Sequence, residues 1–348
     1  MAQNSGGKHS NAFSVFVMLA LLVGCIIFFF DKKISQIQYN ELKLSDIYIA
    51  PVTTDGYMNI ALFGVDARNV DEKNVRSDTI IIASINEDTY EVKLTSVFRD
   101  TYVYVENYGK NNSITTDDYT KITHAYAFGG PALAVSTLNE NFDLNITEYA
   151  TVNFYVLADI VNQLGGLDIN IETTAMVDSI NRYGKEVADG ENKVFTNVTS
   201  TGPQLLDGYQ VLGYARTRKI DSDFKRAERQ REVLSKILAE LKSSNLTTLN
   251  NIYNDVADNL ETSMGSNEIL ALLPNISKYE IGTSNGFPYN NYTAKRSGSS
   301  SMEVYSENMI DDICTLHSTL YPDIEYEPSD RVRNICATLN ELELNREE

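Results

Sequence analysis

The run MNIALFGV at residues 58–65 is continuously apolar and has the length and composition of a strand buried on both faces. Two more strand-like segments follow it, TIIIASI at 79–85 and EVKLTSVF at 91–98. The polar stretch NEDTY at 86–90 separates these two segments and is typical of a short hairpin turn. We therefore expect the three segments to be neighbours in one sheet.

Helix and strand patterns alternate after this hairpin. Helix signals cover 121–142 with an interruption at Gly129-Gly130, and a strand-like segment follows at 149–153. A helix over 154–164 and a second strand at 167–171 complete a strand–helix–strand unit. This alternation predicts an α/β fold, with a mixed central β-sheet that is flanked by helices on both faces.

Composition limits the kinds of protein that the chain encodes. Of its 348 residues, 43% are hydrophobic and 22% are charged, which is ordinary for a globular protein and excludes wholesale disorder. Its net charge of -19 would repel the phosphates of nucleic acid, so we expect no nucleic-acid partner. The 3 Cys and 3 His residues show no metal-ligand spacing, which argues against a structural zinc site.

The N-terminal segment predicts a membrane anchor. FSVFVMLALLVGCIIFFF at 13–30 approaches the roughly 20 residues that cross a bilayer as a helix. A lipoprotein signal built on Leu22-Val23-Gly24-Cys25 and an ordinary cleaved signal peptide are the alternatives. The apolar run continues through Ile26–Phe30 beyond that cysteine, which favours an uncleaved anchor. Basic residues on the two sides are balanced, so charge does not choose the orientation.

Two cysteines, Cys314 and Cys336, lie in helix-like stretches on either side of a turn near 321–324. In a helical hairpin they would lie at a similar height, which would allow a disulfide in an oxidising compartment. Two unrelated buried thiols are the alternative, and the sequence leaves both open.

Charged residues gather in four short clusters. Three of them are Asp66-Ala67-Arg68, Arg76-Ser77-Asp78-Thr79 and Arg99-Asp100-Thr101. The fourth cluster, residues 216–231, holds seven basic residues against three acidic ones. On a chain of strong negative charge, such a local reversal indicates a site that binds an anion.

The expected strand order brings the first three clusters together. Asp78 begins one strand of the predicted hairpin and Arg99 follows the other, so antiparallel pairing places them at the same end. If the strand at 58–65 runs parallel to the strand at 91–98, Asp66 emerges at that edge too. Ligands of α/β folds commonly bind at such an edge.

The helix expected from Asp223 carries polar residues on its inward side. At 100° per residue, its apolar stripe comprises Ala227, Leu234, Ile237, Leu238 and Leu241. Asp223, Arg226 and Gln230 fall on the same face, near a helix N-terminus whose dipole favours anions. Polar groups on a buried face are costly unless they line a site. Arg229 projects about 60° from Arg226, and a solvated position remains open for it.

Arginines together with a few carboxylates are the groups that phosphoryl transfer requires. Arginine binds phosphate oxygens through two parallel hydrogen bonds, and aspartate oxygens hold a hard divalent cation such as Mg²⁺. The sequence has no glycine-rich phosphate loop beside these clusters, which argues against a Walker-type nucleotide enzyme.

Five motifs follow one another along the chain. They are NIALFGVDAR at 59–68, RSDT at 76–79, FRDT at 98–101, KITHAYAFGG at 121–130 and YARTRKIDSDFKRAERQ at 214–230. In this order and spacing, from Met58 to Pro288, the chain resembles the LytR-CpsA-Psr family of bacterial cell-envelope proteins. Phe98, Thr123 and Lys225 depart from the family's usual Pro, Asn and Gly, which concerns detail of the pocket. Residues 302–348 lie outside the resemblance.

The resemblance implies a membrane-anchored phosphotransferase. Such enzymes transfer teichoic acid, capsular polysaccharide or a related glycopolymer from a polyprenyl pyrophosphate carrier to peptidoglycan through a phosphodiester bond, with Mg²⁺ or Mn²⁺ as cofactor. We then expect a single-pass protein of the bacterial cell membrane, with its N-terminus inside and its catalytic domain extracytoplasmic. The expected parts are a cytoplasmic stub at 1–10, a transmembrane signal anchor at 11–30, a stalk or lead-in at 31–56, a catalytic domain at 57–289, and a linker with a small helical C-terminal extension at 290–348.

Residue roles follow from the matching motif positions. The resemblance assigns Asp66 and Asp78 to the metal ion, and it makes Asp66, Asp78, Arg99 and Asp223 the catalytic residues. Asp223, or one of the metal-binding aspartates, would deprotonate the acceptor sugar hydroxyl. The residues assigned to the pyrophosphate or to supporting its ligands are Arg68, Arg76, Arg99, Lys121, Arg216, Arg218, Arg226, Arg229 and Gln230.

Two other functions remain open at this point. A polyprenyl pyrophosphate-saccharide hydrolase would differ only in using water as the acceptor. A non-catalytic, membrane-tethered wall-binding or regulatory protein would bind anionic polymer through the same arginines. In that case, changing Asp66 or Asp78 to Ala would leave the function intact.

Overall fold

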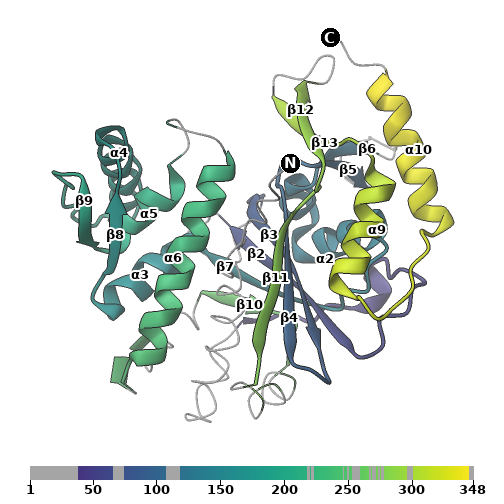
Figure 1. Cartoon of the computed structure of the whole chain (residues 1–348), viewed down its shortest axis with the longest axis horizontal. Coiled ribbons are helices and arrows are strands. Elements are labelled where there is room, and N and C mark those ends of the chain that lie inside the picture. The colour runs from purple at the N-terminus through teal and green to yellow at the C-terminus, as the bar shows by residue number, and fades with distance from the viewer. Residues whose placement is uncertain are drawn as a thin grey trace, which may run out of the picture.

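The computed structural model describes residues 38–65, 74–106, 118–217, 220, 223–245, 259–265, 278–295 and 301–344, with isolated residues between 247 and 275. The described chain forms a seven-stranded mixed sheet with helices packed on both sides (Figure 1). The mixed α/β architecture predicted from the sequence is therefore confirmed. The predicted anchor at 11–30 lies outside the described residues, and no helix among those residues has the length and apolar surface of a membrane span.

The central sheet has the strand order β1-β10-β7-β2-β3-β4-β11. Its strands are β1 (Gln38–Tyr39), β10 (Leu260–Thr262), β7 (Glu148–Asn153), β2 (Tyr57–Val65), β3 (Ser77–Asn86), β4 (Glu91–Val97) and β11 (Glu280–Phe287). Strands β2 and β4 both pair antiparallel with β3, so they point in the same direction. Strands β7 and β11 run parallel to them. The predicted site depended on this shared direction of β2 and β4, and the sheet has it.

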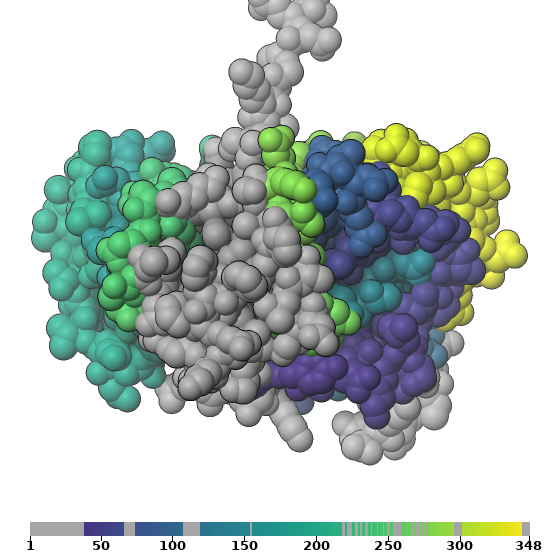
Figure 2. All heavy atoms as spheres, turned by 90° about the horizontal axis from the view of Figure 1, so that it is seen from below, coloured from purple at the N-terminus to yellow at the C-terminus, as the bar shows by residue number. Residues whose placement is uncertain are grey.

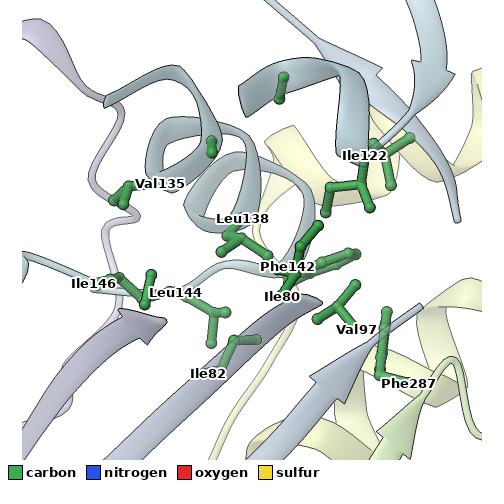
Figure 3. Close-up of a cluster of buried hydrophobic side chains, with 14 of the residues drawn as sticks. Ile80, Ile82, Val97, Ile122, Val135, Leu138, Phe142, Leu144, Ile146 and Phe287 are labelled. Carbon is green, nitrogen blue, oxygen red and sulfur yellow. The ribbon is translucent and has the colours of Figure 1, made fainter. Parts of the chain in front are cut away.

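Strands β2 and β3 bury side chains on both faces, as the apolar run at 58–65 predicted. Ile60 and Leu62 belong to the core on one side of the sheet, whereas Phe63 belongs to the core on the other side. Figure 3 shows the second core, in which Ile80 and Ile82 of β3 face side chains of a long helix. Burial on both faces requires helices on both faces.

The two sides carry different helices, as Figure 1 shows. On one side lie α3 (Phe154–Leu164), α4 (Thr174–Gly190), α5 (Gly208–Arg216) and α6 (Asp223–Ser243). On the other side lie α2 (Thr123–Phe142), α9 (Met309–Leu320) and α10 (Asp330–Leu344), with the short strands β5 (Tyr102–Val105), β6 (Asp118–Lys121), β12 (Asn291–Lys295) and β13 (Met302–Ser306). Helix α2 is kinked at Gly130, whose φ of 64° and ψ of -158° are non-helical, so the predicted interruption at Gly129-Gly130 is confirmed.

The strand–helix–strand unit is only partly as predicted. Strand β7 and helix α3 lie where expected, but β8 (Leu167–Ile171) leaves the central sheet and pairs antiparallel with β9 (Gly202–Leu206). The reason lies in the sequence LDINI, whose Asp168 and Asn170 alternate with buried residues and are exposed. A strand with one solvated face suits a two-stranded hairpin better than a central sheet position.

The lead-in segment packs against the domain from residue 38 onward. Strand β1 pairs in parallel with β10 at the edge of the sheet, and Leu42 and Ile47 are buried in the core beside α2. Residues 44–46 form a short 3₁₀ helix, η2 (Leu44–Asp46). In Figure 2 the lead-in segment, coloured purple, is packed against the rest of the protein. A packed lead-in describes residues 38–56 better than a free-standing stalk does.

The C-terminal segment is also part of the main core. Ile313 and Leu316 of α9 are fully buried in the core that α2 also lines, and α9 packs against β4 and β11. The hydroxyl of Tyr321, just beyond α9, donates a 2.9 Å hydrogen bond to Oδ1 of Asn59 in β2. Helices α9 and α10 agree with the helical character expected for residues 290–348, but the segment is not an appendage on a separate core. The domain boundary at 289 stays a prediction.

Cys314 of α9 and Cys336 of α10 are both free thiols in the structure. Cys336 is buried, and burial together with the nearby Asp143 carboxylate raises the pKa of its thiol to about 12. A thiol with so high a pKa carries little thiolate at neutral pH and reacts slowly. Of the two alternatives from the sequence, the structure shows the pair of free thiols.

We predict that His317 makes the stability of this core depend on pH. The His317 ring stacks on Tyr326 with centroids 3.5 Å apart, and its Nε2 donates a 2.8 Å hydrogen bond to the Phe142 carbonyl. Burial lowers the pKa of His317 from 6.5 to about 4. Between these values the unfolded chain binds more protons, so stability falls as the pH is lowered through that window, by roughly 3 kcal/mol in all.

The measurement is urea unfolding of the whole chain, followed by circular dichroism at several pH values between 4 and 7. The variant His317→Gln keeps an amide donor but does not titrate, so it should lose less stability than the unchanged protein as the pH falls. Equal losses in the two proteins would contradict the prediction.

Candidate functional site

The candidate site lies at one edge of the central sheet. Strands β2, β4, β7 and β11 all end at this edge, and β3 begins there. Val65, the last residue of β2, pairs with Ser77, the first residue of β3. The chain therefore leaves β2 beside the start of β3, where Asp78 lies. This is the carboxyl edge of the parallel strands, at which α/β proteins commonly bind ligands.

A chain of ion pairs joins two of the predicted clusters and Lys121 at this edge. Nη1 of Arg99 donates a 2.7 Å hydrogen bond to Oδ1 of Asp78. Nε of Arg99 lies 3.4 Å from Oδ2 of Asp100, and Nζ of Lys121 donates a 2.9 Å hydrogen bond to Oδ1 of the same carboxylate. The four side chains are between 12% and 26% exposed, so these contacts are weakened less by solvent than surface pairs are.

The backbone around Arg99 is fixed by hydrogen bonds. The amide of Thr123 donates to the Arg99 carbonyl at 3.1 Å, and its hydroxyl donates to the Ser77 carbonyl at 2.9 Å. Thr101 donates from both its amide and its hydroxyl to the Phe98 carbonyl. The first residue of α2 thus ties together the start of β3 and the turn after β4. Thr123, noted in the sequence only as a departure from the family motif, is buried and makes these bonds.

His124 lies at this edge, and no role was predicted for it from the sequence. His124 lies in the first turn of α2, and its Nδ1 is 2.7 Å from the hydroxyl of Thr120 in β6. Burial lowers the pKa of His124, and the charges of Arg76 and Lys121 lower it further. The imidazole is therefore neutral near pH 7. The motif KITHAYAFGG was the one signal that pointed to this residue.

A second group of predicted site residues lies where α5 leads into α6. Arg216 is the last residue of α5 and is half-buried, and Arg229 in α6 is buried. Nη2 of Arg229 donates a 2.6 Å hydrogen bond to the carbonyl of Thr217, between Arg216 and Arg218, and its guanidinium lies over the ring of Tyr214. Arg229 therefore holds the backbone that carries the two pyrophosphate arginines assigned from the sequence.

The inward face of α6 includes Arg229, for which the sequence left a solvated position open. Arg229, Val233, Ile237 and Leu241 are buried, whereas Arg226 is half-exposed. At 100° per residue, Arg226 projects between Val233 and Ile237, so its direction agrees with the predicted inward face although it is half-exposed near the start of the helix. The buried stripe runs at i, i+4, i+8 and i+12 and includes Arg229. Its predicted members Ile237 and Leu241 are confirmed. The burial of Arg229 was not predicted, because an arginine counts as solvent-facing in a periodicity argument.

Several assigned residues cannot be placed. Asp66, Arg68 and Arg218 lie outside the described residues, and so do the side chains of Asp223 and Gln230 within α6. Of the others, Asp78, Arg99 and Lys121 are joined by the ion pairs above, Arg76 is exposed beside them, and Arg216, Arg226 and Arg229 lie at the α5–α6 junction. Asp100 was part of a quoted cluster but received no role.

The donor set at the sheet edge suits a hard divalent cation in its chemistry. Asp78 gives one carboxylate oxygen to Arg99 and has a second, and carboxylate oxygens are the protein ligands that Mg²⁺ prefers. Val65, which precedes Asp66, pairs with Ser77, which precedes Asp78. Among the described residues no three His, Cys, Asp or Glu side chains form a group that would hold a metal ion. The metal assignment of Asp66 and Asp78 stays a prediction.

Comparison with models of known families matches residues 29–313 to the LytR_cpsA_psr family. The chain belongs to the LytR-CpsA-Psr family. The match covers well over half of the chain and extends to residue 313, so it includes β12, β13 and the start of α9. Those segments lay outside the resemblance that the five motifs carried.

Relatives and solved structures agree with this membership. The polyisoprenyl-teichoic acid–peptidoglycan teichoic acid transferase TagT of Bacillus subtilis (strain 168) is 32% identical over 223 residues, 63% of this chain and 64% of the relative. The chain thus spans less than two thirds of that relative's length. The structure of TagT bound to LIIa-WTA covers 77% of this chain and 91% of its own, with a TM-score of 0.56 and 26% identity.

A further structure supports the fold alone. It is the LytR-CPS2A-psr family protein YwtF (TagT) with bound octaprenyl pyrophosphate lipid. It covers 82% of this chain and 99% of its own, with a TM-score of 0.54 and 22% identity.

We predict that Arg229 is needed for stability far more than Arg226. Arg229→Met removes the donor to the buried Thr217 carbonyl and leaves that carbonyl unsatisfied, so the free energy of unfolding should fall by about 3 kcal/mol. Arg226→Met, one turn earlier on the same helix and half-exposed, should cost less than about 1 kcal/mol. Urea unfolding of the whole chain, followed by circular dichroism, compares the two variants. An equal loss of unfolding free energy in the two variants would contradict the prediction that the Arg229 hydrogen bond stabilises the fold.

Proposed function

We propose that this protein is a membrane-anchored phosphotransferase. It transfers a glycopolymer, such as teichoic acid, capsular polysaccharide or a related polymer, from a polyprenyl pyrophosphate carrier to peptidoglycan through a phosphodiester bond. The observation that carries the proposal is the ion-pair chain of Asp78, Arg99, Asp100 and Lys121 at the carboxyl edge of the sheet, in a chain of this family.

The charge of the site supports a pyrophosphate ligand. The whole chain carries a net charge of -19, yet two arginines and a lysine, Arg76, Arg99 and Lys121, gather at the sheet edge around two carboxylates. Cations confined to one place on an acidic protein attract a multivalent anion there and repel it elsewhere. Arginine forks bind phosphate oxygens in a planar, two-bonded manner, which fixes the orientation of a phosphate as well as its position.

The relatives support the choice of donor and acceptor. TagT is named as a polyisoprenyl-teichoic acid–peptidoglycan teichoic acid transferase, and solved structures of TagT contain LIIa-WTA or octaprenyl pyrophosphate lipid. A lipid-linked donor also gives the apolar segment at 13–30 a use. An enzyme anchored in the membrane that holds its donor meets that donor at a raised effective concentration. We therefore place the anchor in the cytoplasmic membrane, with the N-terminus inside and the folded domain outside.

The transfer exchanges one P–O bond for another. The acceptor hydroxyl oxygen bonds to the phosphorus that carries the glycan, the bond from that phosphorus to the polyprenyl phosphate breaks, and polyprenyl phosphate leaves. The hydroxyl proton passes to a base, for which Asp223 or a metal-binding aspartate is our assignment. Arg99, Arg216 and Arg218 bind the pyrophosphate oxygens on which negative charge accumulates.

Asp66 and Asp78 would hold Mg²⁺ or Mn²⁺ at this edge. When bound, the ion would neutralise charge on the pyrophosphate and its leaving group. Arg99 binds one oxygen of Asp78, which orients the carboxylate, and the other oxygen would be the ligand of the ion. Removal of the metal by a chelator should therefore stop turnover, and added Mg²⁺ or Mn²⁺ should restore it.

We predict that Asp78 and Arg99 are both essential for transfer. The whole chain in detergent is incubated with a polyprenyl pyrophosphate saccharide, Mg²⁺ and a peptidoglycan oligomer, and products are followed by mass spectrometry. Asp78→Asn and Arg99→Lys should each lower turnover at least about 100-fold, because each removes a group that acts on the charge of the transition state.

Lys185→Gln is the matched control, because Lys185 makes an exposed ion pair with Asp189 on α4, and its loss should leave turnover unchanged. Free phosphosaccharide without a peptidoglycan adduct would replace the transferase with the hydrolase. Tight binding of the donor without any turnover would replace it with the tethered wall-binding protein.

A further inference from the structure

The hairpin of β12 and β13 reaches the turn that carries Arg99 and Asp100. The amide of Val304 in β13 donates a 2.8 Å hydrogen bond to the Asp100 carbonyl, and Thr101 and Val304 form a parallel bridge. Beside this bridge the rings of Tyr102 and Tyr305 lie 5.3 Å apart. A segment near the C-terminus thus extends the short sheet of β5 and β6 at the point where the ion-pair chain is anchored.

Side-chain alternation places the charged groups of this small sheet on one face. Tyr102 pairs with Lys121, so their side chains share a face of the small sheet, and the Tyr102 ring contacts the Tyr305 ring. Glu303, two residues before Tyr305, is buried, and it accepts a 3.1 Å hydrogen bond from the Tyr305 hydroxyl. Glu303 and Tyr305 of β13 therefore lie on the same face of this small sheet as Tyr102 and Lys121.

The Asp100 carboxylate has a place between two cations. It lies 3.4 Å from Nε of Arg99 through one oxygen and accepts from Lys121 at 2.9 Å through the other. A lysine side chain has a four-carbon flexible stem, and ordering it at the moment of binding costs conformational entropy. A carboxylate that already holds the ammonium removes that cost before the ligand arrives.

We propose that Asp100 is a positioning residue that sets Lys121 and Arg99 for the pyrophosphate, and that β13 holds Asp100 in place through the Val304 amide. This inference rests on the proposed function for its ligand. Asp100 itself need not touch the substrate, because it acts through the two cations. The hairpin β12–β13 then belongs to the site rather than to an extension.

Two variants separate the carboxylate from the backbone contact. Asp100→Asn removes the charge that holds the two cations. Val304→Pro removes the amide that donates to Asp100. Because that amide points toward β5, Val304 and its partner Thr293 form a pair without mutual hydrogen bonds, so the proline removes no bond between β12 and β13.

Thr293→Pro is the matched control. Thr293 is exposed, and its amide points away from β13 by the same pairing rule, so the proline enters the same hairpin without touching Asp100. Thermal unfolding by circular dichroism checks that each variant of the whole chain is folded. If one of the two test variants does not fold, the other still decides, because they reach Asp100 by different routes.

The first readout does not need turnover. Trace acetylation of the whole chain in detergent, followed by mass spectrometry, reports how freely the Lys121 amine reacts. The Lys121 rate should rise several-fold in Asp100→Asn and in Val304→Pro, and it should stay unchanged in Thr293→Pro. An unchanged rate in both test variants would overturn the proposal. A rate that rises equally in Thr293→Pro would also overturn it, since the hairpin would then act without Asp100.

The second readout is the kinetics of transfer. In Asp100→Asn, kcat should fall about tenfold or more while the KM for the lipid donor stays level or falls, because the site gains positive charge but loses its geometry. A loss of folded protein would lower apparent kcat with no change in KM and no change in the Lys121 rate of the folded fraction. Unchanged kcat and KM would overturn the proposal.

Failure of the proposed function can be told apart from failure of this inference. If the unchanged protein transfers nothing, the proposed function fails, and the affinity for inorganic pyrophosphate measured by calorimetry replaces the kinetics. A raised Lys121 acetylation rate in Asp100→Asn, together with an unchanged or higher affinity for pyrophosphate, supports the positioning role. Weaker pyrophosphate binding together with an unchanged Lys121 rate overturns it.

Discussion

Strands β2, β3 and β4 are packed between two hydrophobic cores, and this double burial fixes their register. A slip of one residue in β3 would exchange the side chains of the two faces, and each core would then receive groups of the wrong shape. The same register aligns the start of β3 with the end of β4, so that Asp78 and Arg99 meet at 2.7 Å. The position of the charged site is thus a consequence of apolar packing several residues away.

The charged groups at the sheet edge are held by partners of opposite sign, which keeps a cationic site stable before any anion binds. Arg99 and Lys121 share the carboxylate of Asp100, and Arg99 also binds Asp78. Three cations close together without carboxylates would repel one another in a partly buried place. An acidic protein with such a site combines solubility with selective attraction of a multivalent anion.

Local pattern was enough to predict the central hairpin, the direction of its strands and the edge at which Asp78 and Arg99 meet. It failed where distant segments decide the outcome. Nothing in LDINI at 167–171 says which strand it will pair with, and β8 pairs with β9 instead of the central sheet. Periodicity also left open whether Arg229 of α6 is buried, because its core position depends on a hydrogen bond to Thr217 that no local pattern shows. The contact of β13 with the Asp100 backbone also joins segments that are far apart in the sequence, so no local pattern predicts it.

The hydrogen bond from Tyr321 to Asn59 joins residues 262 positions apart. Asn59, near the start of β2, is 2% exposed, and without Tyr321 its side chain would lose a hydrogen-bond partner in an apolar interior, which is costly. During synthesis, the segments of β2, β3 and β4 are made long before the residues of α9 and Tyr321, which complete the core on one side of the sheet. Contacts of such long range slow folding. The nascent sheet must stay protected on that face until nearly the whole chain has been synthesised.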